Sequence, residues 1–155
     1  MQQIDEWYMR RALELASLAE AQGEVPVGAL VVLDGEIIGE GFNAPITMTD
    51  PTAHAEVQAL RAAAKHLGNY RLGGVTIYAT LEPCIMCAGA IVHSRVQRLV
   101  FGARDLRFGG VRSKFCLADS DLLNHQVEVV EGVLGAECTE VLQRFFERKR
   151  ILKEE

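Results

Sequence analysis

Residues 75–94, VTIYATLEPCIMCAGAIVHS, contain the pattern that decides the fold. The run 75–80 is apolar and β-branched, which is typical of a buried strand. Residues 84–94 follow as an expected helix, led by Pro83 because proline fits the first helical turn. A second short strand is expected at residues 98–102. A strand, a helix and a strand in succession predict two parallel strands joined by a crossover.

The segments before this stretch predict a helix and a hairpin. Residues 5–21 carry apolar side chains near helical spacing, which favours an amphipathic helix. Two β-rich runs, residues 27–32 and 36–41, flank the pair Asp34-Gly35. An Asp-Gly pair between two such runs is typical of a tight hairpin. The first part of the chain therefore supplies at least two antiparallel strands.

Further segments complete an α/β pattern. A helix is expected over residues 54–67, and Asp50 or Thr52 can cap its first N–H groups. The rest of the chain predicts a loop with a short helix over 106–125, a strand at 127–131 and a helix over 136–149. No linker or repeat interrupts the chain, so we expect one domain over residues 1–155. Its fold class is an α/β sandwich of about five strands with helices on its faces.

Composition is that of an ordinary globular protein. Apolar residues make up 49% of the 155 residues and charged residues 24%. No apolar stretch is long enough for a membrane span, and the N-terminus lacks a secretory or transit pattern, so we expect a cytoplasmic protein that does not bind membranes. Four cysteines include one Cys-x-x-Cys pair, which in such a chain favours metal or redox chemistry over disulfides.

Positive charge is concentrated in the second half of the chain. The net charge is −5, yet ten of the sixteen Lys and Arg residues lie from Arg98 onward. Nine of these ten form two groups: Arg104, Arg107, Arg112 and Lys114, and then Arg144, Arg148, Lys149, Arg150 and Lys153. A local basic surface can attract nucleic acid despite an acidic total. The alternative is a solvated helix face beside a loop, which the charges alone favour.

Two short motifs predict a metal site. His54-Ala55-Glu56 and Pro83-Cys84-Ile85-Met86-Cys87 each lie at an expected helix start. Zinc binds imidazole nitrogen and thiolate sulfur, and a catalytic site uses three protein ligands and leaves one position for water. Cys84 and Cys87 are three residues apart and share one helix face, where the helix dipole favours thiolates. His54, Cys84 and Cys87 are therefore the expected ligands of one Zn²⁺.

Glu56 is the expected proton-transfer residue. On a regular helix His54 and Glu56 point about 200° apart. They can converge only ahead of the helix end, so we expect the metal between two helix N-termini, with Glu56 beside the zinc-activated water but not a ligand. The alternative is a structural zinc site, which would leave Glu56 without a role and would take its fourth ligand from Cys116, Cys138, His93 or His125.

The combined motifs resemble the pattern of zinc-dependent nucleobase deaminases. Flanking segments narrow the resemblance to the bacterial tRNA-specific adenosine deaminases of the cytidine deaminase-like superfamily. The resemblance runs from about Trp7 to Arg148 and is weakest over residues 106–123. It rests on residues 24–29 (EVPVGA), 41–43 (GFN), 50–56 (DPTAHAE), 81–90 (LEPCIMCAGA), 93–95 (HSR), 101–105 (FGARD) and 124–125 (NH).

This resemblance implies a fold, an activity and partners. The implied fold is a three-layer α/β/α sandwich with a five-stranded mixed sheet and helices on both faces. The implied reaction is hydrolytic deamination of adenosine to inosine, with release of ammonia, at the wobble position of an arginine tRNA anticodon. The implied cofactor is one zinc per subunit, and the implied assembly is a homodimer whose two subunits both contact the anticodon stem-loop.

The resemblance also assigns substrate contacts. Asn43 is expected to hydrogen-bond the flipped adenine, Val27 to line the base pocket and Ala55 to belong to the same substrate site. Asp105 is expected to contact RNA beside the target base. The last helix is expected to touch neighbouring nucleotides through Phe145, Phe146 and Arg148. Each has a structural alternative, since Asn43 can shape a turn, Asp105 can cap a segment and the phenylalanines can belong to the core.

Two other functions stay open at this level. A guanine deaminase, or another deaminase of free bases or nucleosides, shares the zinc motifs but does not need a basic last helix. A catalytically silent zinc-binding partner subunit of a deaminase complex is the other possibility. Glu56 disfavours it, because a silent subunit has no use for a proton shuttle.

Overall fold

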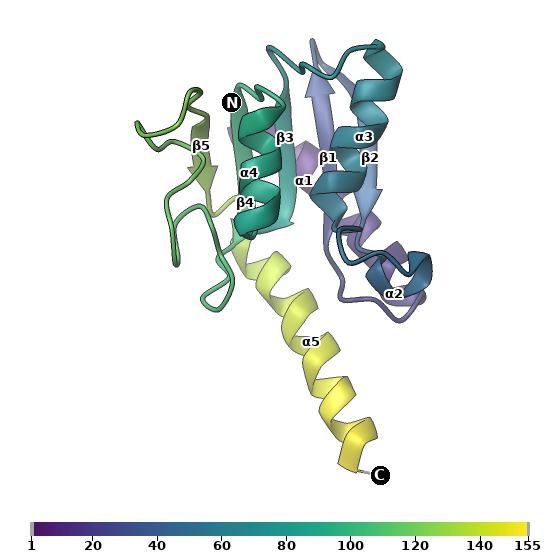
Figure 1. The fold of residues 1–155 in the computed structure, drawn as a ribbon. Coiled ribbons are helices and arrows are strands. Elements are labelled where there is room, and N and C mark those ends of the chain that lie inside the picture. The colour runs from purple at the N-terminus through teal and green to yellow at the C-terminus, as the bar shows by residue number, and fades with distance from the viewer. Residues whose placement is uncertain (1, 155) are drawn as a thin grey trace.

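The computed structural model describes residues 2–154, which contain one five-stranded sheet. The order of the strands is β2-β1-β3-β4-β5, as Figure 1 shows from the face that carries α3 and α4. The strands are β1 (Gly28–Leu33), β2 (Glu36–Phe42), β3 (Thr76–Leu81), β4 (Arg98–Ala103) and β5 (Glu128–Glu131). The expected five-stranded mixed sheet is confirmed.

The sheet has an antiparallel half and a parallel half. Strand β1 pairs antiparallel with both β2 and β3. The turn between β1 and β2 lies at Asp34-Gly35, where φ is 50° and 79°, so the Asp-Gly hairpin is confirmed. Strands β3, β4 and β5 are parallel, as the alternation of strands and helices predicts. Their carboxyl ends therefore meet at one edge of the sheet.

Helices cover both faces of the sheet. Figure 1 shows α3 and α4 side by side on one face and α1 behind the sheet, which confirms the three-layer α/β/α arrangement. The five helices are α1 (Gln2–Ala21), α2 (Pro45–Met48), α3 (Ala55–Leu67), α4 (Ile85–His93) and α5 (Gly135–Glu154). Within residues 2–154, none of them combines the length and the apolar character that crossing a bilayer requires.

Two apolar cores hold the layers together. The larger packs α3 and α4 against the sheet and includes the fully buried Ile77, Ile91 and Phe101. The smaller packs α1 against the opposite face and includes Met9 and the Cys138 side chain of α5. Since alternate residues of a strand point to opposite faces, each central strand contributes to both cores.

Helix α3 lies unusually close to β2 because two glycines make room for it. A Cβ atom on Gly39 would overlap the backbone of Ala59, and a Cβ on Gly41 would overlap the backbone of Ala55. Larger side chains at these positions would push the helix off the sheet. The two glycines thereby fix where α3 begins, and its first turn carries His54 and Glu56.

Some local predictions are wrong at the ends of elements. The N-cap of α3 is His54, without a side-chain hydrogen bond, because Asp50 accepts hydrogen bonds from the N–H and hydroxyl of Thr52 instead. Helix α4 begins after Cys84, so Pro83 lies before the helix and not in its first turn. Cys84 and His54 therefore occupy equivalent N-cap positions.

Other differences concern whole segments. The short helix α2 has no counterpart in the prediction. The segment 106–125 contains turns but no helix, and α5 continues to Glu154, well past the predicted end at residue 149. Figure 1 shows that the C-terminal half of α5 extends beyond the sheet. These features depend on contacts between distant parts of the chain, which periodicity does not report.

Candidate metal centre and cavity

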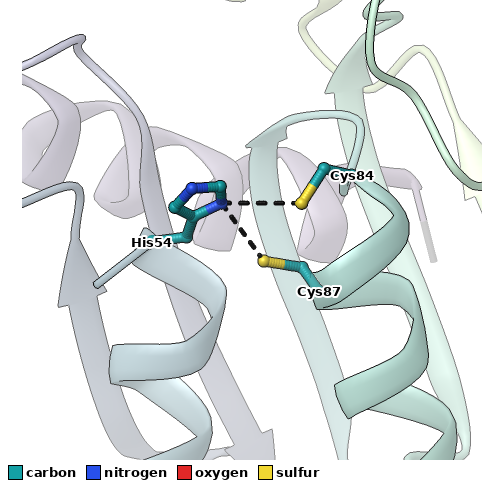
Figure 2. Close-up of side chains that lie close together, drawn as sticks. All are labelled: His54, Cys84 and Cys87. Atoms are coloured by element: carbon teal, nitrogen blue, oxygen red, sulfur yellow. Dashed lines mark hydrogen bonds between the residues drawn. The ribbon is translucent and has the colours of Figure 1, made fainter. Parts of the chain in front are cut away.

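Three side chains from two helix starts converge at the carboxyl edge of the sheet. His54 is the N-cap of α3, Cys84 is the N-cap of α4, and Cys87 lies one turn into α4. Figure 2 shows the Nδ1 atom of His54 facing both sulfurs, at 3.5 Å from each. All three potential ligand atoms lie within 4.8 Å of one another. The structure thus brings these residues together between two helix N-termini.

The local charge favours a thiolate at this cluster. A hydrogen bond from Cys87, together with the facing His54 ring, lowers the pKa of Cys84 to about 4. The same hydrogen bond and burial raise the pKa of Cys87. The pKa of His54 is raised, first by its hydrogen bond to Cys84. A cation bound here would displace the proton with which Cys87 hydrogen-bonds to Cys84, because metal ligands must lose their protons.

The donor set fits zinc in a catalytic rather than a structural site. One imidazole nitrogen and two sulfurs are typical zinc ligands, and three of them leave a fourth position open. No fourth His, Cys, Asp or Glu ligand joins the cluster within residues 2–154. None of the candidate fourth ligands, Cys116, Cys138, His93 and His125, belongs to the cluster. Two of them are engaged elsewhere: the ring of His125 contacts the carbonyl of Val96, and Cys138 packs beneath Gly102.

Glu56 lies beside the cluster without belonging to it. Its side chain is 4% exposed and lines the cavity that opens at the cluster. Burial raises the pKa of the Glu56 carboxyl to about 7, and the carboxyl also faces Cys87 and His54. The first turn of α3 thus presents one possible metal ligand and one buried carboxyl to the same space.

A cavity of about 1250 Å³ opens from the cluster to solvent. Its inner part is lined by His54 and Cys84 of the cluster and by Glu56, Val27 and Asn43. Its outer part has two walls, the loop of residues 104–108 and the face of α5 that carries Leu142, Phe146 and Arg150. A volume of this size exceeds what a single base requires, so the outer walls can contact further parts of a larger ligand.

Comparisons with known proteins identify the family. The sequence model of one protein family, the cytidine and deoxycytidylate deaminase zinc-binding region, matches residues 2–103, which include the whole cluster. A tRNA-specific adenosine deaminase of Haemophilus influenzae is 56% identical over 96% of this chain and 86% of its own length. The chain belongs to the family of tRNA-specific adenosine deaminases.

Solved structures agree with this membership. A tRNA:A34 deaminase, studied for A-to-I editing at the wobble position of transfer RNA, superposes with a TM-score of 0.84 and 41% identity, over 86% of this chain and 97% of its own. A guanine deaminase of Bacillus subtilis superposes with a TM-score of 0.61 and 44% identity, over 64% of each chain. The chain thus contains the zinc-binding region of a deaminase, the cluster is a possible metal site within it, and this member of the family is an enzyme.

The structure brings some of the expected substrate residues to the cavity and leaves others outside it. Val27, Asn43 and Asp105 line the cavity. Ala55 is fully buried against Gly41 and does not line it. One carboxylate oxygen of Asp105 accepts the N–H groups of residues 107 and 108, so this side chain also caps a turn. Three of these four residues therefore reach the cavity, and Ala55, although it directly follows His54, does not.

On α5, one of the three expected residues faces the cavity, and two do not. Phe145 is 8% exposed and carries the ammonium of Lys149 over its ring. Arg148 forms an ion pair of 3.3 Å with Glu20 of α1. Phe146 and Arg150, in contrast, line the cavity. Helical spacing alone could not decide which face of α5 is turned to the site, because the helix has apolar residues on more than one side.

Near the loop wall the cavity is lined by further residues to which the motifs assign no role. Ile85, Phe108 and Phe115 line the cavity although each is more than half exposed. Arg107 and Lys114 lie among them. Exposed aromatic side chains next to basic ones are typical of surfaces that bind single-stranded nucleic acid. The basic group of residues 104–114 was the available signal, but the sequence does not show which of its members face the site.

Proposed function

We propose that this chain converts adenosine to inosine at the wobble position of a tRNA anticodon, with arginine tRNA as the substrate. The observation that carries the proposal is the partly buried His54, Cys84 and Cys87 cluster, with the buried Glu56, at the base of a cavity with aromatic and basic outer walls. An enzyme for free nucleosides needs the inner part only. The tRNA-specific names of relatives that match nearly the whole chain support the same substrate.

We assign the zinc ion to the Nδ1 atom of His54 and the sulfurs of Cys84 and Cys87. When bound, zinc lowers the pKa of water so that a nucleophile forms at neutral pH. The chain's part is to fix three ligands and to leave the fourth position facing the cavity. Burial of Cys87 and Glu56 also keeps bulk water away from the reacting atoms.

Glu56 moves the protons of the reaction. In the proposal its carboxylate takes one proton from water as the water oxygen bonds to C6, and delivers that proton to the adjacent ring nitrogen. It then carries the second proton, from the new C6 hydroxyl, to the exocyclic amine, so that the C6–N6 bond breaks, a C6 carbonyl forms and ammonia leaves. Glu56 suits this role because it lies beside the open position and outside the ligand set.

The remaining cavity residues select the substrate. The amide of Asn43 can pair with the edge of the extruded adenine, and Val27 packs against its apolar face. Ala55 supports them from within the core. Asp105 and Phe146 of the last helix contact the flanking nucleotides, whereas Phe145 packs inside the protein and Arg148 pairs with Glu20. An anticodon loop is single-stranded, so extruding its base costs little.

Assembly and location complete the proposal. Residues 1–155 form one domain, and two copies form a homodimer that holds one stem-loop across both subunits. Large exposed apolar side chains beside the cavity, Leu106 at 72% and Ile85 at 52%, support a partner surface there. A tRNA substrate supports a cytoplasmic location.

Guanine is the second candidate substrate. The observation that favours it is the 44% identity with a guanine deaminase over 64% of this chain. The two candidates differ in what the outer walls do. A guanine deaminase would work at full rate without occupying the basic and aromatic wall of residues 104–108.

Ammonia release separates these candidates. The zinc-loaded protein is incubated with guanine, with cytidine and with an arginine tRNA anticodon stem-loop that carries adenosine at the wobble position. We expect ammonia from the stem-loop only. Ammonia from guanine or cytidine, and none from the stem-loop, would contradict the proposed function.

A further inference from the structure

Glu82 is a buried acid whose position the reaction does not explain. It directly precedes Pro83-Cys84, and its side chain is 2% exposed. Its carboxylate does not join the metal cluster. It faces the loop that follows β4 instead, which begins at Arg104. A buried carboxylate is costly unless donors surround it, so its contacts indicate what it is for.

The Glu82 carboxylate is surrounded by donors from that loop. Its Oε1 atom accepts the N–H of Asp105 at 3.0 Å and the hydroxyl of Ser113. Its Oε2 atom accepts the N–H groups of Val111 at 3.1 Å, Arg112 at 2.7 Å and Ser113 at 2.9 Å. One charged group thus satisfies donors at both ends of residues 105–113.

These contacts replace secondary structure in this segment. Residues 105–113 contain turns and no helix or strand, so their backbone donors have few regular partners. Charge-assisted hydrogen bonds are about twice as strong as neutral ones. The path of this loop across the cavity is therefore set by a side chain more than twenty residues earlier in the chain.

The same loop is also joined to the segment that carries the first cysteine. The N–H of Gly110 donates to the carbonyl of Pro83 at 2.8 Å, and Gly109 forms a β-bridge with Cys84. Gly109 lies directly on the Glu82 carboxylate, and a Cβ atom there would overlap it. The loop and the zinc-binding segment meet through these backbone contacts.

The loop that Glu82 holds is one wall of the cavity. Asp105, Arg107 and Phe108 all line it. We propose that Glu82 is a positioning residue that holds this loop in the form that receives the RNA flanking the target base. It acts through the loop and does not touch the metal or the reacting atoms. This inference rests on the proposed RNA substrate.

The alternative is that Glu82 only stabilises the fold, and a matched buried acid distinguishes the two. Asp5 is 3% exposed and accepts hydrogen bonds from Tyr78 and Arg98. It lies on α1, on the opposite face of the sheet, and does not line the cavity. Loss of its charge is expected to lower stability without changing the loop.

The test compares Glu82→Gln, Gly109→Ala and Asp5→Asn with the wild-type enzyme. A glutamine places an amide N–H₂ against the N–H donors of the loop, and the alanine methyl pushes the loop from the other side. We expect both variants to raise KM for the anticodon stem-loop about tenfold and to change kcat by less than about threefold. Zinc content stays at the wild-type level in both. Asp5→Asn lowers Tm and leaves KM unchanged.

Hydrogen–deuterium exchange distinguishes a local change in the loop from a general loss of stability, because a general loss would speed exchange in other elements as well. We expect Glu82→Gln to speed exchange over residues 105–113 selectively, with α4 protected as in the wild type. If the wild type is active on the stem-loop, two results would overturn this proposal alone. One is a KM in Glu82→Gln that equals the wild-type value, and the other is a KM in Asp5→Asn that rises as much as in Glu82→Gln. A wild type that fails on the stem-loop would overturn the proposed function and this inference together.

Discussion

The two sides of the cavity are built in different ways. The inner side is carried by the first turns of α3 and α4, which begin at one edge of the sheet and bring His54 and Cys84 into equivalent N-cap positions. The outer side consists of an irregular loop and of a helix that extends beyond the sheet. Helices and strands hold the inner side in place. The loop of the outer side is held by hydrogen bonds to individual side chains, above all to Glu82.

This difference separates chemistry from substrate choice. Residues on rigid helix starts keep fixed distances, which proton transfer and metal binding require. The contacts of the loop with Glu82 and with the Cys84 segment run mostly through backbone atoms, so its exposed side chains can change between proteins without disturbing the metal ligands. We therefore expect substitutions on the inner side to abolish turnover and those on the outer side to change RNA affinity.

The largest effect is expected from a zinc ligand. Cys87→Ala removes a buried sulfur from a three-ligand set, so zinc affinity falls by more than the roughly 10–100-fold typical of outer partners. Zinc content measured by mass spectrometry and inosine formation both fall to background. Cys116→Ser changes an exposed cysteine outside the cluster and serves as the control. Full zinc content in Cys87→Ala would show that Cys87 is not a zinc ligand.

The next effect separates proton transfer from metal binding. Glu56→Gln keeps the volume of the side chain but cannot accept a proton, so kcat is expected to fall about 10³-fold. Zinc content and stem-loop binding remain, as measured by metal analysis and fluorescence anisotropy. Glu24→Gln is the control, since Glu24 is also buried but binds the N-terminus of α2. A Glu56→Gln enzyme with normal kcat would refute the assigned role.

A smaller effect is expected on the outer wall. Arg150 lines the cavity, whereas Arg148 is paired with Glu20. Arg150→Ala should raise Kd for the stem-loop several-fold and reduce the slope of log K against log salt by about 0.7, the value for one phosphate contact on a single strand. Arg148→Ala should change the Kd and this slope less than Arg150→Ala does. Equal slopes for wild type and Arg150→Ala would show that this charge is only solvated.

The smallest effect on activity is expected on the far face of the sheet. Asp5 and Arg98 form a bidentate ion pair that is almost completely buried. Breaking such a pair costs about 3 kcal/mol, so Asp5→Asn lowers the free energy of unfolding, measured in urea at pH 7, by that amount. Inosine formation at 25 °C stays unchanged. A stable Asp5→Asn protein would show that this pair contributes little.

The same pair gives a pH dependence. Burial opposes ionisation of Asp5, but hydrogen bonds from Arg98 and Tyr78 outweigh it and hold the pKa below its ordinary value of 3.8. The stabilisation is therefore complete above that value and is lost as the pH falls through the lower, folded-state pKa. The stability difference between wild type and Asp5→Asn should shrink below about pH 4. A difference that persists unchanged in acid would contradict this assignment.

The sequence predicts the inner side well because its information is local. The apolar run before Pro83 and the Asp34-Gly35 pair predict a strand and a hairpin from neighbouring residues alone. The spacing of His54 and Glu56 requires a metal ahead of a helix end, and the structure has the three possible ligands at two such ends.

The outer side could not be predicted in the same way. The loop 105–113 takes its form from Glu82, and α2 is held by Glu24, in each case through contacts across more than twenty residues. The face of α5 that lines the cavity depends on how α5 packs on β4 and β3. Of the expected Phe145, Phe146 and Arg148, only Phe146 lines the cavity, and Arg150 lines it beside Phe146.

Sequencing of the RNA product tests the central claim most directly. A tRNA anticodon stem-loop with adenosine at the wobble position is incubated with zinc-loaded wild-type enzyme or with Glu56→Gln, and inosine is read as guanosine after reverse transcription. The account predicts an A-to-G change at that single position with the wild type and none with the variant. An unchanged wobble adenosine with the zinc-loaded wild type would contradict it.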